Sequence, residues 1–488
     1  MWGFSSALLL AKKWYDVTII EKNDRPGGRL NLLEKKWYKW DMWPSRYLMP
    51  DIFENFFTAL GKNLKDYLSL VQLTPSYRVY YAQKEWEVHA KPFFMDIYTD
   101  IKKTKAEFEK MEAWSWEQLE KYLSVARKAY PIAMKNFVFK NYNTVRELFT
   151  WKNFKSIFSL NIFSTLYRYV SRFIKNEDLK KVLLYTTVFL WTSPYEASAA
   201  YNIMSHLDFN EWVFYPQWGI YEISRALESI AHEFNVKIIY NSPVDKIIVE
   251  DGTISWVQSG KNIHTADIVI SNADMRYTET QLLEKDYQTY PESYRAKKTM
   301  SPSGFIMYLG VDGKLPQLQH HTLVFANDWK IWFDKIFHHP ERSDSPNYYI
   351  CKPSHVDPTV APPGKENLFV FVPIAPGLDK KKEFLKKYGD KILDDIAKNC
   401  NIPDIKNRIE VAEYFSTMDF RMHYNAYKWT ALGLAHTFSQ SAVLRPKNTS
   451  KKVKGLYYAG GYTTPGIWVP MCLLSGQLVA EKIIKKNI

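Results

Sequence analysis

The chain has 488 residues, of which 46% are hydrophobic and 24% charged, and its formal net charge is +13. This length and apolar content allow a large core and favour two domains over one. Three cysteines, Cys351, Cys400 and Cys472, are too few and too scattered for a disulfide framework or a metal cluster, so we expect a reducing compartment and no metal site. No apolar run reaches the 18 or so residues of a transmembrane helix, and the start lacks a signal-peptide pattern.

The positive charge favours a membrane surface over nucleic acid as a partner. Basic residues are spread along the chain, and no nucleic-acid motif accompanies them. Residues 145–175 mix basic and aromatic side chains, which is the composition of an interfacial amphipathic helix attracted to anionic lipid. A lid helix packed on the core, with a solvated basic face, is the alternative.

The first 30 residues predict half of a dinucleotide-binding site. Residues 16–20 form an apolar strand that ends at an acid, Glu21, and the glycine pair Gly27 and Gly28 follows. Such a site also needs a glycine-rich turn before a helix, about 20 residues upstream of the acid, and residues 2–6 stand there, ahead of a helix over 6–13. A strand of about five residues normally precedes this turn, so we expect N-terminal residues to be missing.

The later elements interleave helices with short strands, as judged from hydrophobic periodicity. In chain order, we expect a helix over 51–60, mostly helix over 100–205, a helix over 221–234, strands over 236–240, 246–250, 268–271, 304–310 and 367–373, and a strand, a Gly-Gly loop and a terminal helix over 455–486.

Glycine is scarce in this chain, and tryptophan is abundant. The chain has 19 Gly, whereas a usage of about 7% would give about 34, and it has 17 Trp. Trp14 stands between a helix and a strand, where a residue of positive φ, usually Gly, ends the helix. Trp218, Trp256 and Trp468 stand in similar turn contexts, so we suspect glycines misread as tryptophan.

Six ordered segments make the chain recognisable. They are residues 16–29 (DVTIIEKNDRPGGR), 41–51, 215–220, 271–274, 427–436 and 457–476 (YYAGGYTTPGIWVPMCLLSG). Together they resemble the bacterial phytoene desaturase family of carotenoid enzymes, within the flavin amine oxidase-like superfamily. The resemblance spans nearly the whole chain, and the last segment is the most specific.

The resemblance implies an α/β fold, α+β overall, with a Rossmann-like FAD-binding domain that is discontinuous in sequence and holds an inserted helical-plus-sheet substrate domain. Residues 1–65, 215–290 and 445–488 would form the FAD-binding domain. Residues 66–214 and 291–444 would form the substrate and membrane-facing domain. A substrate tunnel would lie between the two, where pockets commonly form.

The cofactor contacts follow from the chemistry of FAD. Its pyrophosphate needs backbone N–H groups and a helix N-terminus, and its ribose hydroxyls need an acceptor, which Glu21 would supply. Glu21 as a solvated strand end and Arg29 as a surface cation are the alternatives. The expected cofactor-binding residues are Gly3, Phe4, Ser5, Ser6, Glu21, Arg25, Gly27, Gly28, Arg29, Pro44, Ser45, Val244, Asn272, Gly460, Gly461, Val469, Pro470 and Met471.

The implied reaction is FAD-dependent desaturation of a carotenoid precursor, phytoene or a C30 analogue, by hydride transfer to flavin. An aromatic tunnel would stabilise a transient allylic cation, and its candidates are Tyr80, Tyr81, Phe189, Phe305 and Tyr308, each of which could equally belong to the core. No catalytic residue is assigned. Four histidines are expected to serve structure or the surface, two of them in a polar loop: His206, His320, His321 and His436.

The implied partners are a hydrophobic polyene, the cytoplasmic membrane surface, where the protein would be peripheral, and quinone or oxygen as electron acceptor, with no nucleic acid. Other members of the superfamily, namely a carotenoid isomerase, a retinoid saturase or an amine oxidase, are the enzymatic alternatives.

Several tryptophans depart from the family pattern, which carries Gly at their positions: Trp14, Trp37, Trp43, Trp218, Trp256, Trp429 and Trp468. Five more are weaker candidates: Trp2, Trp114, Trp116, Trp191 and Trp212. The simplest hypothesis is a genetic code in which UGA means glycine, translated here as tryptophan. If the tryptophans are real, Trp43 and Trp468 fill the flavin site, and the chain is a degenerate flavoprotein. Arg46 also departs from the family, which often has an aromatic residue there.

Overall fold

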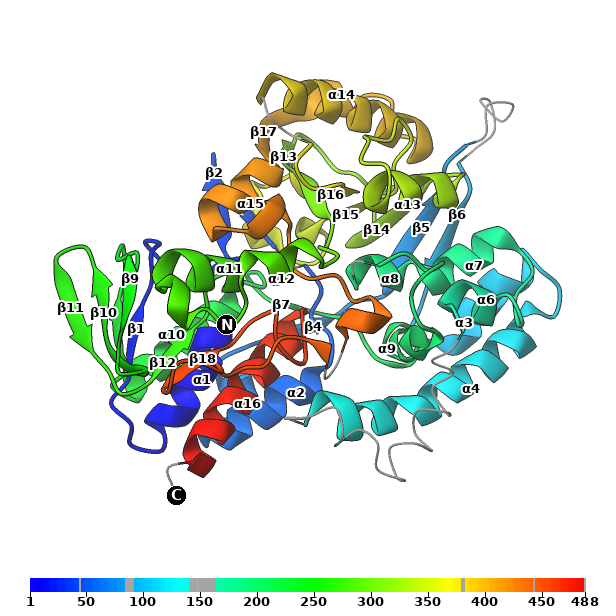
Figure 1. Ribbon diagram of the computed structural model, residues 1–488. Helices are drawn as coiled ribbons and strands as arrows, with labels where there is room; N and C mark the ends of the chain where they lie inside the picture. The colour runs from blue at the N-terminus through cyan, green and yellow to red at the C-terminus, as the bar shows by residue number, and fades with distance from the viewer. Residues whose placement is uncertain are drawn as a thin grey trace.

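The computed structural model describes residues 1–43, 45–83, 92–140, 147, 164–190, 192–378, 382–441 and 444–486. Small parallel strand pairs with their helices lie on one side of the molecule, a large mixed sheet lies above, and a group of helices lies on the other side (Figure 1). The α/β fold class expected from the sequence is confirmed.

Two short parallel strand pairs join distant parts of the chain. β1 (Thr18–Ile20) pairs with β8 (Lys237–Ile239), and β12 (Val269–Ser271) pairs with β18 (Leu456–Tyr458). N-terminal, central and C-terminal segments therefore meet here, as expected for a discontinuous nucleotide-binding unit.

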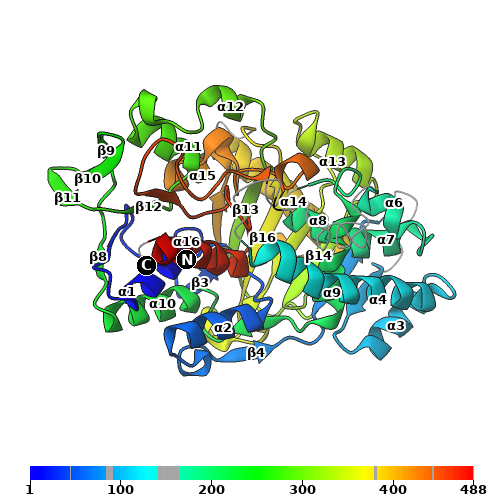
Figure 2. The ribbon, with the colours of Figure 1, turned by 60° about the horizontal axis from the view of Figure 1, so that its bottom comes forward.

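Helix α1 (Trp2–Ala11) packs against α16 (Val469–Lys486) beside these strands (Figure 2). The two helices approach closely because position 476 is glycine. A Cβ at Gly476 would lie 2.5 Å from the carbonyl oxygen of Trp2 and 2.6 Å from Cβ of Ser5.

The strand pairs do not form one continuous sheet in the described part of the chain. β1 hydrogen-bonds only with β8 there, and β12 only with β18. Residues 18–20 and 268–271 both line the same cavity.

The large sheet has the strand order β17-β13-β16-β15-β14-β5-β6, in which only β14 and β5 are parallel. Its strands are β5 (Tyr77–Tyr81), β6 (Phe94–Ile97), β13 (Ser303–Val311), β14 (His321–Phe325), β15 (Tyr348–Cys351), β16 (Glu366–Ile374) and β17 (Ile409–Phe415).

Successive side chains of these strands point to opposite faces of the sheet. Phe305, Met307 and Leu309 of β13 pack in a cluster with α14 (Lys382–Asn399), which lies over one face. Tyr308 of the same strand belongs to the cluster on the other face, which continues into the helical group.

The remaining elements complete the two sides of the molecule. The helical group contains α3 (Ile101–Glu109), α4 (Ser115–Ala133), α6 (Leu166–Val170), α7 (Glu177–Leu184), α8 (Thr186–Phe189) and α9 (Ile203–Asn210). Elsewhere lie α2 (Pro50–Leu60), α10 (Glu222–Glu233), α11 (Met275–Tyr277), α12 (Glu292–Ala296), α13 (Trp329–Phe337), α15 (Thr417–Tyr424), β2 (Leu32–Lys35), β3 (Tyr38–Asp41), β4 (Leu70–Gln72), β7 (Phe214–Pro216), β9 (Lys246–Glu250), β10 (Thr253–Ser259) and β11 (Asn262–Thr265).

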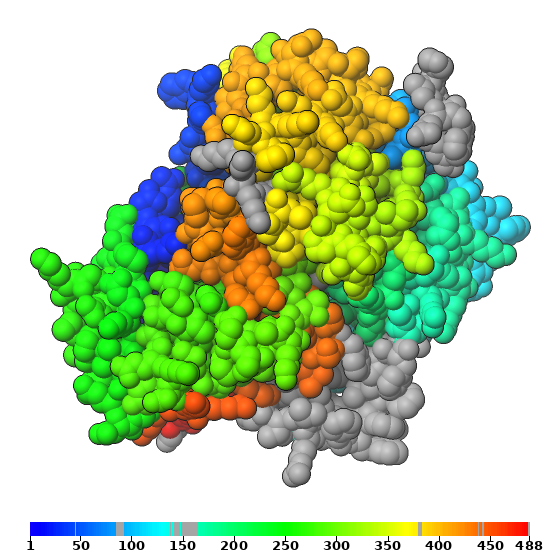
Figure 3. Space-filling view, turned by 45° about the horizontal axis from the view of Figure 1, so that its top comes forward, coloured from blue at the N-terminus to red at the C-terminus, as the bar shows by residue number. Residues whose placement is uncertain are grey.

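Segments 275–300 and 415–435 lie against each other on the face that Figure 3 shows in green and orange. The hydroxyl of Tyr427 donates to Glu292 at 2.5 Å, and the backbone N–H of Tyr427 donates to Asp274 at 3.2 Å. These bonds tie the loop after α15 to the region that follows β12.

Most of the expected elements are confirmed within a few residues, but one expectation is wrong. Residues 2–6 belong to α1 and do not form a turn. Phe4, Ser5 and Ser6 are buried there, and continuing the helix places Phe4 in the core. Most of the basic and aromatic stretch 145–175 lies outside the described residues.

Candidate functional site

A cavity of about 1070 Å³ runs along the strand pairs and reaches the large sheet. Its walls come from the start of α1, from β1 and the glycine pair, from β12 and from the first residues of α16. This volume lies at the upper end of the range of about 300–1,000 Å³ that is typical of ligand pockets. N-terminal, central and C-terminal segments of the chain therefore build one site.

Most of the expected cofactor-binding residues line this cavity: Gly3, Phe4, Ser6, Glu21, Gly27, Gly28, Arg29, Ser45, Val244, Asn272, Val469 and Pro470. Gly460 and Gly461 line a small second cavity, which shares Trp2, Arg29 and Asn272 with the large one. Pro44 lies outside the described residues.

Three expected residues do not line either cavity: Ser5, Arg25 and Met471. Ser5 faces α16, where its hydroxyl donates to the carbonyl of Leu473 at 2.6 Å. Arg25 forms an exposed pair with Asp24 at 3.4 Å.

The loop after β1 needs its first glycine. Gly27 has a φ of +114°, and a Cβ there would lie 1.9 Å from the carbonyl oxygen of Leu30. At the strand end, Oε1 of Glu21 accepts from the backbone and side-chain N–H groups of Asn23, at 2.9 and 2.7 Å. Glu21 is thus oriented at the cavity wall by its own loop.

Arg29 is held in the cavity wall by its surroundings. Its Nε donates to the carbonyl of Ala431 at 2.7 Å, and its guanidinium lies 4.7 Å from the ring centre of Tyr424. Burial lowers the pKa of Arg29, while Tyr424 and Asp274 act in the opposite direction. The geometry favours an internal cation over the surface cation that the sequence left open.

The far end of the cavity is aromatic and apolar. Trp43, Tyr349, Phe369, Phe371 and Trp468 line it. The ring centres of Trp43 and Phe371 lie 4.7 Å apart, edge to face. The indoles at 43 and 468 therefore occupy the region where the sequence places the flavin ring.

The aromatic residues proposed for the tunnel are not the ones that line this cavity. The side chains of Tyr80, Tyr81, Phe305 and Tyr308 are buried in the hydrophobic clusters of the sheet, and that of Phe189 is not described. The alternation along the predicted strand 367–373 could have identified Phe369 and Phe371, because residues two apart share a face.

The expectation of a polar loop at His320 and His321 is wrong for His321, while His320 lies in the bend before β14 but is buried. His321 begins β14, and the two side chains are 1% and 0% exposed. Nδ1 of His321 lies 2.6 Å from the hydroxyl of Tyr349, which lines the cavity. Neighbouring strands bury these imidazoles, and the local sequence carries no signal of that.

A buried polar cluster surrounds Arg46, another residue of the cavity wall. Its Nη1 donates to the hydroxyl of Tyr185 at 2.9 Å and lies 3.5 Å from Asp208. The hydroxyls of Tyr77 and Tyr185 each donate to Asp208 at 2.5 Å. Sequence reasoning singled out Arg46 only as a departure from the family.

Many of the suspect tryptophans have a left-handed backbone. Positive φ values from 62° to 103° occur at Trp14, Trp37, Trp114, Trp218, Trp429 and Trp468. The other described non-glycine residues of this kind are mainly Asn and Asp, which tolerate the conformation. Trp43 and Trp256 are not in this group, and Trp191 lies outside the described residues.

Within the described ranges, no helix combines the length and the apolar character needed to cross a membrane.

Comparisons with known proteins agree with this geometry. Residues 3–484 match the family model described as flavin containing amine oxidoreductase. A carotenoid 3,4-desaturase of Haloarcula japonica is 40% identical over 99% of this chain and 96% of its own length. A zeta-carotene-forming phytoene desaturase of Myxococcus xanthus is 32% identical over 99% of this chain and 92% of its own. An oxidoreductase structure from Methanosarcina mazei shares the fold, with a TM-score of 0.64 and 18% identity over 99% of this chain and 98% of its own.

The cavity fits FAD in its nucleotide half. The glycine pair allows close approach of the backbone, the start of α1 opens into the cavity, and Glu21 stands at the strand end. We conclude that the chain belongs to the flavin containing amine oxidoreductase family and is an FAD-dependent oxidoreductase.

Proposed function

We propose that this enzyme desaturates a carotenoid precursor, phytoene or a C30 analogue, by hydride transfer to its flavin. The observation that carries the proposal is the identity of 40% and 32%, over nearly the full length, to two named carotenoid desaturases. The apolar end of the cavity, with Val188, Phe369 and Phe371 in its wall, supports a hydrocarbon substrate.

The cofactor-binding residues proposed are those given by the sequence, and the cavity supports most of them. Glu21 would accept from the ribose hydroxyls, and Gly27 and Gly28 would let the backbone approach the phosphates. Val469 and Pro470 begin α16, whose N-terminus carries a partial positive charge that would face the flavin. When bound, FAD supplies the hydride acceptor.

We also propose that the tryptophans with positive φ, together with Trp43 and Trp256, are glycines in the cell, read from UGA codons. Left-handed backbone costs a residue with a Cβ about 1–2 kcal/mol, whereas glycine adopts it freely. By contrast, Trp40, Trp329 and Trp332 are buried in the core and have no positive φ. A left-handed group and a buried group with ordinary φ support different codons for the two groups of tryptophan.

Glycine at positions 43 and 468 would clear the flavin end of the cavity, which both indoles line. If both residues are real tryptophans, the chain is a flavoprotein that has lost its cofactor, kept for binding or scaffolding. This non-enzymatic candidate rests on the same two indoles in the cavity wall, so one experiment distinguishes it from the enzyme.

The experiment compares the chain as written with a variant carrying Gly at Trp14, Trp37, Trp43, Trp114, Trp218, Trp256, Trp429 and Trp468. We expect the Gly variant to purify with a flavin absorbance near 450 nm and to convert phytoene, and the chain as written to do neither. Codon sequences and peptide masses from the native protein check the assignment directly. UGG codons, or flavin bound equally by both proteins, would contradict the recoding.

The domain boundaries remain part of the proposal. Residues 1–65, 215–290 and 445–488 would bind FAD, and residues 66–214 and 291–444 would hold the substrate at the membrane. The pairing of β1 with β8 and of β12 with β18 supports the first unit. A peripheral position on the cytoplasmic membrane would supply the insoluble polyene, and quinone or oxygen would reoxidise the flavin.

A further inference from the structure

A short chain of hydrogen-bonded side chains runs from the cavity wall into the large sheet. Ser45 and Tyr349 both line the cavity, and their hydroxyl oxygens lie 2.7 Å apart. The hydroxyl of Tyr349 then meets Nδ1 of His321 at 2.6 Å. This chain begins beside the position where the sequence places the flavin ring.

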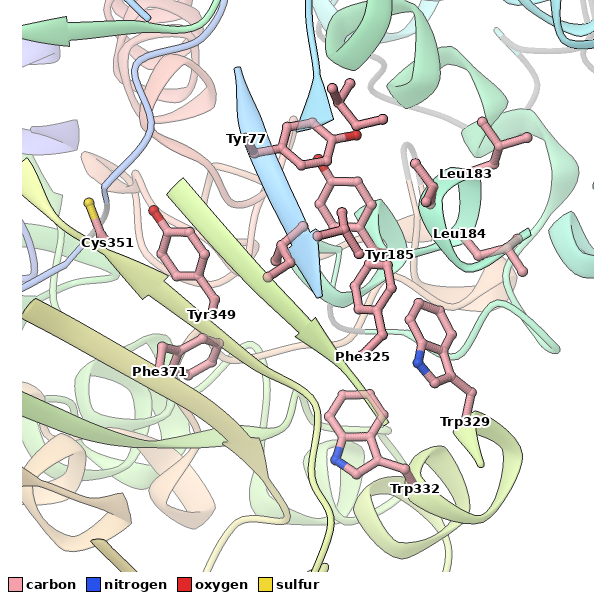
Figure 4. Packing of buried hydrophobic residues seen from close by; sticks show 14 of the residues in the cluster. Tyr77, Leu183, Leu184, Tyr185, Phe325, Trp329, Trp332, Tyr349, Cys351 and Phe371 are labelled. Carbon is pink, nitrogen blue, oxygen red and sulfur yellow. The ribbon is translucent and has the colours of Figure 1, made fainter. Parts of the chain in front are cut away.

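Strand geometry fixes the contact. In the antiparallel pair of β14 and β15, His321 stands opposite Cys351, and Leu323 stands opposite Tyr349. Tyr349 and His321 are therefore diagonal neighbours, within reach of long side chains on one face. Figure 4 shows Tyr349 and Cys351 projecting to the same side of β15. The adjacent Tyr348 packs on the other face, in the cluster with α14.

His321 is kept neutral by its surroundings. Its side chain is fully buried, and burial, together with His320, Arg46 and His355, holds its pKa well below the usual value. A neutral imidazole that accepts at Nδ1 carries its proton on Nε2. Burial and these neighbours disfavour the imidazolium, so His321 is unprotonated before the reaction and is a weak, transient proton acceptor for Tyr349.

We propose that Tyr349 receives the proton lost by the substrate and that His321 stores it. This inference rests on the proposed desaturation. One substrate carbon loses hydride, with its electron pair, to the bound flavin. The neighbouring C–H bond breaks, and its electrons become the second bond of the new C=C. The released proton bonds to the oxygen of Tyr349 while the hydroxyl proton of Tyr349 moves to Nδ1 of His321, which becomes an imidazolium.

A weak base is suited to this step. A proton on the carbon next to a developing allylic cation is strongly acidic. The acceptor must therefore be unprotonated when the proton leaves, but it does not have to be a strong base. A more basic imidazole would be partly protonated in advance and unable to accept. When product leaves, the proton returns through Tyr349 and Ser45 to the cavity.

The test uses the holoenzyme of the Gly variant described above as the parent, and three proteins that each carry one further substitution. Tyr349→Phe keeps the ring and removes the hydroxyl. His321→Asn keeps an acceptor oxygen near the position of Nδ1 but cannot be protonated. Tyr348→Phe is the matched control on the opposite face of the same strand. Flavin reduction by phytoene in phosphatidylcholine vesicles is followed anaerobically in a single turnover.

We expect the reduction rate to fall about 10²- to 10⁴-fold in the first two variants, the range for loss of a general base, and to be unchanged in Tyr348→Phe. Flavin content and phytoene affinity should stay equal in all proteins, which a merely structural role would not predict for His321→Asn. Reduction at the parent rate by Tyr349→Phe would overturn the relay. If the parent itself does not reduce its flavin, the proposed function fails instead.

A second readout does not depend on turnover. The ¹⁵N resonance of Nδ1 in histidine-labelled protein should show an unprotonated, hydrogen-bonded nitrogen at His321, and it should shift in Tyr349→Phe but not in Tyr348→Phe. A protonated Nδ1 in the parent would overturn the proposal even if His321→Asn fails to fold.

Discussion

At the scale of single residues, the left-handed tryptophans are the least expected feature of this protein. A Cβ in this backbone region clashes with the adjacent carbonyl, and only Gly, Asn and Asp visit it routinely. Trp14 and Trp37 are 96% and 89% exposed, so packing does not offset the strain. Buried Trp40 and Trp332 show the opposite pattern, with full burial and ordinary φ. Backbone conformation and exposure together therefore distinguish Trp14 and Trp37 from Trp40 and Trp332, whereas Trp43 and Trp256 are suspected from the sequence pattern alone.

Replacing Trp14 with Gly should stabilise the fold. The change removes left-handed strain of about 1–2 kcal/mol and gives up little packing, because the indole is almost fully exposed. We expect a gain of about 1 kcal/mol in the free energy of unfolding, measured by urea denaturation. The control, Trp332→Gly, should cost about 3 kcal/mol or more. A loss of stability in Trp14→Gly would argue that tryptophan is native there.

At the scale of elements, one carboxylate connects β3 to the start of α10. Asp41 ends β3, and its two oxygens accept from the backbone N–H groups of Ile220 and Tyr221, each at 2.9 Å. Gly219 permits this approach, since a Cβ there would lie 3.0 Å from Oδ1 of Asp41. Burial raises the pKa of Asp41 from 3.8 to about 7, although both amide bonds oppose the shift.

This shift predicts a pH dependence of stability. Because the folded pKa lies above the unfolded one, the contribution of Asp41 is fully present below about pH 4 and is lost as pH rises through about 7. One pKa unit corresponds to about 1.4 kcal/mol, so the change amounts to a few kcal/mol. Asp41→Asn should remove it, which urea denaturation of both proteins between pH 4.5 and 7.5 would reveal. Parallel curves of unfolding free energy against pH for the two proteins would show that Asp41 stays ionised in the folded state. Other buried acids affect both proteins alike, so they cancel in this comparison.

Elements set by local sequence could be predicted, and elements set by distant partners could not. β9 coincides with the expected 246–250, because the Asp251-Gly252 turn fixes its end. β15 was not expected, since four residues carry too little periodicity and the strand is defined by pairing with β14 and β16. The cofactor-binding residues that the sequence could identify lie in local motifs. The contact of Tyr349 with His321 depends instead on the register of two paired strands, which the local sequence does not determine.

At the scale of the whole molecule, the strand pairs lie on one side and the helical group on the other, with the large sheet above them (Figure 1). The cavity extends from the strand pairs toward that sheet. If the substrate is the proposed C30 or C40 hydrocarbon, it would reach the cavity from a membrane. The net charge of +13 would then favour binding of the protein to an anionic membrane that holds this substrate.

Binding to anionic vesicles should depend on where the basic residues lie. We expect sedimentation with phosphatidylcholine vesicles that contain phosphatidylserine at 0.1 M salt, where the Debye length is about 10 Å, and weaker binding at 1 M, where it is about 3 Å. Changing two exposed residues, Arg168 in α6 and Arg172 just after it, to Ser should weaken binding.

The charge-matched control changes Lys237 and Lys246, exposed residues of β8 and β9 at the opposite side, to Ser. If both double variants weaken binding equally, net charge alone attracts the protein, and the helical group has no special role. If vesicles without phosphatidylserine bind the protein as well, apolar contact dominates. If neither vesicle binds it, the peripheral membrane proposal is wrong, and the proposed polyene would have to be delivered to the cavity by another route.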